Sequence, residues 1–215
     1  MLYSMATTIS PAITAADSDE YRKQIEQVAN VAVRLHIDVS DGVLTPNKLI
    51  DIDQVWWPGG VRADLHVMYK KPFEHTQLML DLRPQLIIVH AEAEGDFLRF
   101  AEQAHRNGVE VGVAIQQDTQ PDILRPALQA IDHVLIFSGK LGFFGGEADL
   151  SLLQKAKRLR ELKPQLEIGW DGGVNVDNAK KLAQGGVDVL NSGGFVQKAD
   201  SPTSAYEQLV AAASG

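Results

Sequence analysis

Short apolar, β-branched runs alternate with amphipathic helical patterns along the whole chain, and this alternation restricts the fold more than any other feature. The runs predict eight strands, which begin near Thr8, Arg34, Val61, Leu86, Val109, His133, Glu167 and Val187. The helical patterns between and after them cover residues 18–32, 73–82, 95–107, 121–130, 149–163, 175–185 and 202–213. Strands that alternate strictly with helices form a parallel sheet, because each parallel connection needs a crossover.

Eight such units of about 25 residues predict an α/β fold, a single (β/α)8 TIM barrel with one domain over residues 1–215. The chain is shorter than the ~250 residues typical of this fold, and a doubly wound open sheet is the alternative. The barrel is favoured because polar residues end several different strands, and barrel active sites are built at that end. No linker-like segment divides the chain.

The charge and composition exclude several classes of function. A formal net charge of −8 argues against nucleic acid or an anionic membrane as the main partner. The chain has no cysteine, so disulfides, thiolate nucleophiles and cysteine-ligated zinc are excluded. Residues 1–10 lack a signal-peptide pattern, and no apolar stretch approaches the ~20 residues that a membrane span needs. We therefore expect a cytoplasmic enzyme or binding protein.

The segment from Leu35 to Gly42 carries the most unusual strand pattern. Alternate side chains of a strand share a face, so His36 and Asp38 point one way while the residues between them are apolar. A satisfied buried pair without function is the simpler explanation for these two residues alone. His66 ends the third strand and Asp171 ends the seventh, and four such residues at one barrel mouth are improbable as packing.

Two imidazoles and two carboxylates in one place suit two kinds of chemistry. They are ligands for one divalent metal ion (Zn, Fe, Mn or Co), among which the sequence does not choose. The two carboxylates, Asp38 and Asp171, are also an acid/base pair. His90 closes the fourth strand and is equally compatible with a supporting or a structural role, while His75 and His105 fall in helical patterns and are expected at the surface.

Glycines gather at the ends of the last three predicted strands. For any single pair a tight turn is the better explanation. Barrels, however, often bind phosphate through backbone N–H groups of the loops after strands 7 and 8. The cluster therefore favours a phosphate site, whose candidate residues are Gly142, Gly145, Gly146, Gly172, Gly173, Gly193 and Gly194.

Several of these motifs together resemble the ribulose-phosphate 3-epimerase family, from about Ile9 to Val196. The residues that carry the resemblance are Ser10–Ile13, Asp17, His36–Gly42, Pro46–Asn47, His66–Met68, Val89–Glu92, Gly145–Glu147 and Asp171–Gly173. The resemblance implies a metal held by His36, Asp38, His66 and Asp171. It further implies that both aspartates act as acid and base, that the glycine loops hold the phosphate, and that Ser10 and Met68 belong to the substrate site.

The implied reaction is inversion of C3 of a ketose phosphate, from D-ribulose 5-phosphate to D-xylulose 5-phosphate, through an enediolate. The chain departs from the family pattern at Ala12, Ser40, Val43 and 137–147, and it has polar Asn191 and Ser192 before the last glycines. Two alternatives therefore stay open: the protein is an epimerase of another phosphorylated ketose, such as a hexulose phosphate, or it is an inactive homologue that binds a sugar phosphate. A decarboxylase of the orotidine-phosphate type is rejected, because Asp38-Val-Ser40-Asp41 lacks the required lysine.

The partner predicted from these motifs is a small phosphorylated sugar. Trp56 and Trp57 lie in a loop, where burial under the barrel or contact with a second copy of the chain explains them better than ligand stacking. We expect a homo-oligomer.

Overall fold

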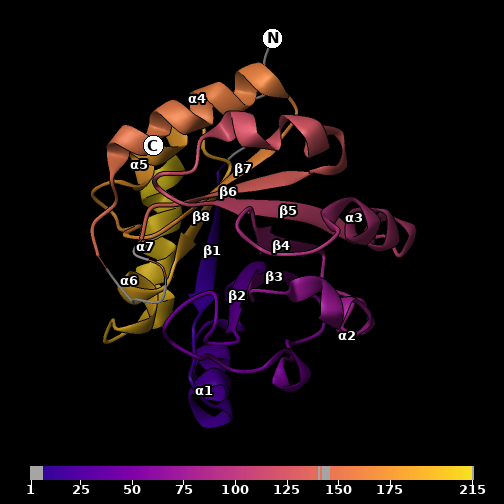
Figure 1. Ribbon diagram of the computed structural model, residues 1–215. Helices are drawn as coiled ribbons and strands as arrows, with labels where there is room; N and C mark the ends of the chain where they lie inside the picture. Colours follow the sequence, from indigo (N-terminus) through magenta and orange to yellow (C-terminus); the bar gives the residue numbers. More distant parts are fainter. Residues whose placement is uncertain (1–6, 140, 142–145, 215) are drawn as a thin grey trace.

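Eight parallel strands close into a barrel in chain order, with β1 beside β8 (Figure 1). The computed structural model describes residues 7–139, 141 and 146–214. The closed sheet confirms the predicted (β/α)8 barrel and excludes the open-sheet alternative. The strands are β1 Thr8–Ile13, β2 Arg34–Ser40, β3 Arg62–Met68, β4 Leu86–His90, β5 Glu110–Ile115, β6 His133–Phe137, β7 Glu167–Asp171 and β8 Val189–Ser192.

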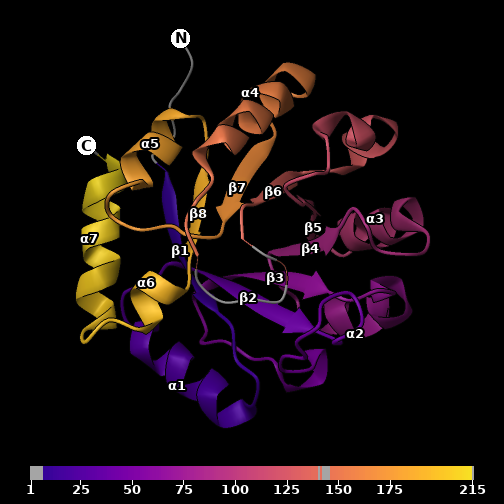
Figure 2. The same cartoon turned by 60° about the vertical axis from the view of Figure 1, so that its left-hand side comes forward.

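Helices surround the barrel on its outer side (Figure 2). They are α1 Ser18–Val28, α2 Thr76–Asp81, α3 Phe97–Arg106, α4 Leu153–Leu162, α5 Ala179–Gln184, α6 Gly194–Gln197 and α7 Pro202–Ser214, with 3₁₀ turns at Ile52–Gln54, Pro72–His75 and Leu150–Leu152. Local chemistry sets some of their ends: the Asp17 side chain accepts from the backbone N–H groups of Asp19 and Glu20, which caps α1. Within the described ranges, no helix combines the length and apolar character that crossing a membrane requires.

One helical prediction needs correction, and one short helix was not predicted. Residues Pro121–Ala130 form a 3₁₀ helix rather than an α-helix. Pro126 lies inside this segment, and proline removes an N–H group and clashes with the preceding turn of an α-helix. The short helix α6 was not predicted, since four residues are too few to show a helical period.

The two-residue period of the strands divides side chains between the barrel interior and the helix layer. On β2, Leu35, Ile37 and Val39 face outward and are fully buried in the main apolar core. The interior is charged at its amino-terminal end and polar at its carboxyl end. On β2 and β3 these two parts follow each other directly, because Arg34 precedes His36 and Asp64 precedes His66 on the inward face. On β4, β5 and β6 a small apolar cluster fills the interior; it consists of Leu86, Ile88, Ala114 and Leu135.

Arg34 organises the charged end of the interior. Its Nε donates to Asp64 Oδ2 at 2.5 Å, and its two terminal nitrogens donate to the two oxygens of Glu167 at 2.8 Å each. His133 Nδ1 lies 2.7 Å from the same Glu167 carboxylate. The Arg34 side chain is 4% exposed and that of Asp64 is 1% exposed, so removing Arg34 would leave the buried Asp64 carboxylate without its nearest cation.

Replacing Arg34 by leucine should therefore lower the free energy of unfolding by about 3–5 kcal/mol, the usual cost of breaking a buried ion pair by removing one partner. Urea denaturation followed by circular dichroism measures this change. The control is Arg158→Leu, which removes an arginine that pairs with Asp122 at the surface and should have little effect. Equal stability losses in the two variants would show that the buried network is not special.

Candidate metal centre and active site

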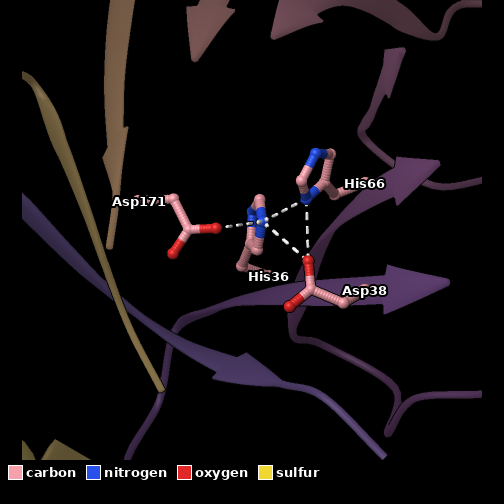
Figure 3. Close-up of side chains that lie close together, drawn as sticks. All are labelled: His36, Asp38, His66 and Asp171. Atoms are coloured by element: carbon pink, nitrogen blue, oxygen red, sulfur yellow. Dashed lines mark hydrogen bonds and ion pairs between the residues drawn. The ribbon is translucent and has the colours of Figure 1, made fainter. Parts of the chain in front are cut away.

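Four side chains from three strands converge at the carboxyl end of the barrel (Figure 3). His36 and Asp38 come from β2, His66 from β3 and Asp171 from β7. One nitrogen or carboxylate oxygen from each lies within 4.8 Å of those from the others. His66 Nδ1 is 2.8 Å from Asp38 Oδ1 and 3.2 Å from His36 Nε2. His36 Nε2 is in turn 3.9 Å from Asp171 Oδ2.

The two carboxyl groups of this cluster have opposite electrostatic surroundings. Burial alone would raise the pKa of Asp38, but hydrogen bonds and positive charge from His36 and His66 hold it well below its usual range. Burial raises the pKa of Asp171 to about 7, with a further contribution from the negative charge of Asp38. Near neutral pH, without a metal, Asp38 is therefore ionised while Asp171 holds its proton much more readily.

The two histidines also differ. Burial opposes protonation of His36, yet its hydrogen bond to Asp38 and the negative charge around it raise its pKa overall. For His66, burial dominates and lowers the pKa to about 4. One imidazole is thus cationic more readily than the other, and its charge lies between the two carboxylates.

Residues around the cluster hold its members in place. The Thr14 hydroxyl donates to Asp38 Oδ2 at 2.7 Å, which leaves Oδ1 facing the histidines. His66 Nε2 lies 2.9 Å from His90 Nε2, behind the cluster. His90 Nδ1 lies 3.5 Å from Glu92, which also accepts the Thr119 hydroxyl. The structure thus places His90 in a supporting position.

The donor set fits a divalent ion. Two ring nitrogens and two carboxylate oxygens face one another, and a cation between them would relieve the repulsion of their lone pairs. His66 contacts His90 through Nε2, while its Nδ1 faces Asp38 and His36, where an ion would be bound; metal-binding histidines commonly hydrogen-bond through their second nitrogen in this way. The cluster could therefore hold a metal, and its mixture of nitrogen and oxygen suits zinc, iron, manganese or cobalt.

A cavity of about 330 Å³ opens beside the cluster. Asp38 and Asp171 reach it directly, and Met68 and Phe137 supply apolar wall. The Phe137 ring centroid lies 6.3 Å from that of His66, so the ring covers one side of the cluster. This volume is at the lower end of the range for small-molecule sites.

The glycines of the last loops lie on the same cavity. Gly146, Gly172, Gly173, Gly193 and Gly194 all line it, whereas Gly142 and Gly145 fall outside the described residues. Two of them have no room for a side chain. A Cβ on Gly172 would lie 2.3 Å from Gly139 N, and one on Gly173 would lie 2.2 Å from Ala148 N, with φ of +107° and +71°. The main chain at Gly172 and Gly173 therefore packs closely against the main chain at Gly139 and Ala148, within the loops for which the sequence predicts a phosphate site.

Other residues singled out in the sequence lie farther from the cavity. Ser10 faces the barrel interior but is completely buried and is not part of the cavity lining. Ser40 hydrogen-bonds to the Asn47 carbonyl at 2.9 Å, and Val43 is 71% exposed, so neither departure from the family pattern alters the described wall. His75 and His105 lie at the surface, as expected.

Some residues at the site were missed or undervalued in the sequence. Thr14 contacts Asp38 directly and follows β1 immediately; its place two residues beyond Ala12, in the same alternation, was a usable signal. Lys198 lines the cavity from just beyond α6, a helix that the sequence pattern did not indicate.

Loss of one cluster histidine should abolish tight metal binding. We expect His66→Asn to lower affinity for a divalent metal by more than the roughly 10- to 100-fold that loss of an outer-shell partner costs. Elemental analysis after gel filtration gives the metal content, and titration of the metal-free protein gives the affinity. His75→Asn is the matched control, because it makes the same change at an exposed histidine. If both variants keep the wild-type metal content, the cluster is not the metal site.

The chain is similar to known proteins over nearly its whole length. Residues 8–197 match the ribulose-phosphate 3 epimerase family. The ribulose-phosphate 3-epimerase of Helicobacter pylori is 32% identical over 94% of this chain and 95% of its own length. That of Bacillus subtilis is 27% identical over 87% of this chain and 91% of its own. A solved 3-hexulose-6-phosphate synthase, 16% identical, covers 96% of this chain and 99% of its own with a TM-score of 0.73, which shows the fold alone. The chain therefore belongs to the ribulose-phosphate 3-epimerase family, a family of isomerases.

Proposed function

We propose that this protein is a metal-dependent epimerase that interconverts D-ribulose 5-phosphate and D-xylulose 5-phosphate by inverting C3. One observation carries the proposal. Asp38 and Asp171 come from strands on different sides of the barrel mouth, reach one cavity, and have pKa values displaced in opposite directions. A pair of carboxyl groups with separated pKa values is the arrangement that acid/base catalysis requires.

The chemistry requires both a base and a source of positive charge. The C3 proton lies next to the C2 carbonyl, yet it is far too weak an acid for a carboxylate acting alone. A divalent ion held by His36, Asp38, His66 and Asp171 would supply positive charge that stabilises the negative charge developing on the substrate oxygens. The cluster geometry supports this assignment, because all four donors face the point where two of them also reach the cavity.

The two aspartates would divide the proton transfers. One of the two would remove the C3 proton from one face and the other would deliver a proton to the opposite face. In the metal-free site Asp171 is the one that holds a proton more readily near neutral pH. After turnover their protonation states are exchanged, which prepares the site for the reverse reaction. Thr14 and His66 keep the Asp38 carboxylate oriented through this exchange.

The glycine loops would hold the phosphate. Gly172 and Gly173 follow β7, Gly193 and Gly194 follow β8, and all four line the cavity near Asp171. Main-chain N–H groups can bind an anion without side-chain charge, which suits a chain whose formal net charge is −8. The names of the curated relatives support a pentulose 5-phosphate as the first candidate substrate.

Exchange of the C3 proton tests the reaction directly. Metal-loaded protein in D₂O should incorporate deuterium at C3 of D-ribulose 5-phosphate, followed by NMR. Asp38→Asn and Asp171→Asn should each slow the exchange by roughly 10²- to 10⁴-fold, the usual contribution of a general acid or base. The exposed Asp53→Asn variant is the control. Exchange on a hexulose phosphate instead would change the substrate, and exchange on neither sugar would favour an inactive binding homologue.

Gly193 offers a clean test of the phosphate site. Among the described residues, a Cβ there would meet only Ala12 Cβ at 3.5 Å and Ala12 O at 4.0 Å, so alanine fits the described fold. Because the added methyl would intrude on the phosphate, Gly193→Ala should raise KM by roughly 10- to 100-fold, as small misplacements of bound substrates do. The thermal midpoint should not change. Gly59→Ala is the control, because no atom of the part of the chain that the structure describes lies within 4 Å of the added Cβ. An unchanged KM would place the phosphate elsewhere.

A further inference from the structure

We infer that Asn191 selects the substrate by hydrogen-bonding the hydroxyl on the carbon between the reacting carbon and the phosphate-bearing carbon. This inference rests on the proposed function, because it uses the placement of the substrate between the aspartates and the glycine loops. For a pentulose 5-phosphate the group concerned is the C4 hydroxyl. Asn191 suits this role because of its position, because its carboxamide oxygen lacks a partner, and because the polar groups beside it are engaged.

Asn191 lies between the two parts of the site. On β8 it pairs in register with Asp171 of β7 on one side and with Ser10 of β1 on the other. Gly193 is two residues farther along the same strand direction and lines the same cavity. Inward-facing residues at this spacing are roughly 6.6 Å apart along a strand. A substrate that reaches from Asp171 to the glycine loop must therefore pass Asn191 with its middle carbon.

The carboxamide of Asn191 has no partner for its oxygen in the part of the chain that the structure describes. The residue is 2% exposed, and Oδ1 is buried without a hydrogen bond. Most buried polar side-chain atoms in proteins are paired, because leaving one unpaired costs about 1–3 kcal/mol. Ser10, its neighbour on β1, does not satisfy it, since the Ser10 hydroxyl is itself buried and unpaired. A carboxamide offers both a donor and an acceptor, so a ligand hydroxyl satisfies it well.

The other polar side chains on this part of the cavity are already engaged. Thr14 donates to Asp38, and the amide of Asn175 donates to the Gly173 carbonyl. The hydroxyl of Thr45 donates to the Asn47 carbonyl. Ala12, opposite Gly193, contributes only a methyl group. Among the described residues, Asn191 is therefore the buried polar side chain on this wall that remains available to hydrogen-bond a hydroxyl; Lys198 also lines the cavity but is exposed.

Binding measurements test this assignment without requiring turnover. Metal-loaded protein is titrated by calorimetry with ribitol 5-phosphate and with its 4-deoxy counterpart, which lacks only the hydroxyl in question. Wild type should bind the complete polyol roughly 10- to 100-fold more tightly, because the deoxy compound leaves the buried carboxamide unpaired. In Asn191→Leu, a near-isosteric apolar variant, the two ligands should bind equally. Ser192→Ala is the matched control, because its hydroxyl is bonded to the Val174 carbonyl, and it should keep the wild-type preference.

The outcomes separate this inference from the proposed reaction. A preference that Asn191→Leu removes supports the inference even if no sugar exchanges its C3 proton, in which case only the proposed reaction fails. An equal preference in wild type and Asn191→Leu overturns the inference, even if C3 exchange proceeds. Asn191→Val is the second variant if the leucine protein does not fold, as judged by circular dichroism, and the same two results apply to it.

Discussion

The two-residue period of side chains along the strands of a closed barrel is the constraint on which the rest of this structure depends. Every second residue of each strand must enter a narrow interior, and its neighbours must enter the apolar layer beneath the helices. On β2 the inward set is Arg34, His36, Asp38 and Ser40, so one strand supplies both the buried ion pair and half of the candidate metal site. The residues that stabilise the barrel and those that form the candidate metal site therefore lie in the same interior, at different positions along the barrel axis.

This constraint explains why much of the site could be predicted from sequence. His36 and Asp38 lie on the inward face of β2, His66 lies on that of β3, and Asp171 ends β7, so the closed parallel barrel brings the four side chains together. The glycines after β7 and β8 followed from the same reasoning about loops. Local patterns therefore sufficed wherever strand period and strand end determined the position of a residue.

Other features required information that no local pattern contains. The depth of Ser10 below the cavity depends on strand tilt and on the register of β1 against β8. The importance of Asn191 lies in a missing partner, which becomes visible only when all neighbours are placed. The 3₁₀ form of Pro121–Ala130 follows from Pro126, a signal that was present in the sequence and was outweighed by the apolar periodicity.

The direct succession of Arg34 and His36 on the inward face of β2 has a consequence for how this protein can change over time. Asp64, which accepts a hydrogen bond from Arg34, also supplies negative charge that contributes to raising the pKa of His36, so the ion-pair network and the candidate metal cluster are electrostatically linked. Leu86, Ile88, Ala114 and Leu135 fill the interior beside β4, β5 and β6, whereas on β2 and β3 the charged residues and the cluster residues follow each other directly. Effects of substitutions usually add only at well-separated sites without shared partners. Mutations that tune the stability of the charged end therefore also shift the protonation of the cluster, so the two ends of the barrel are expected to evolve together rather than as independent modules.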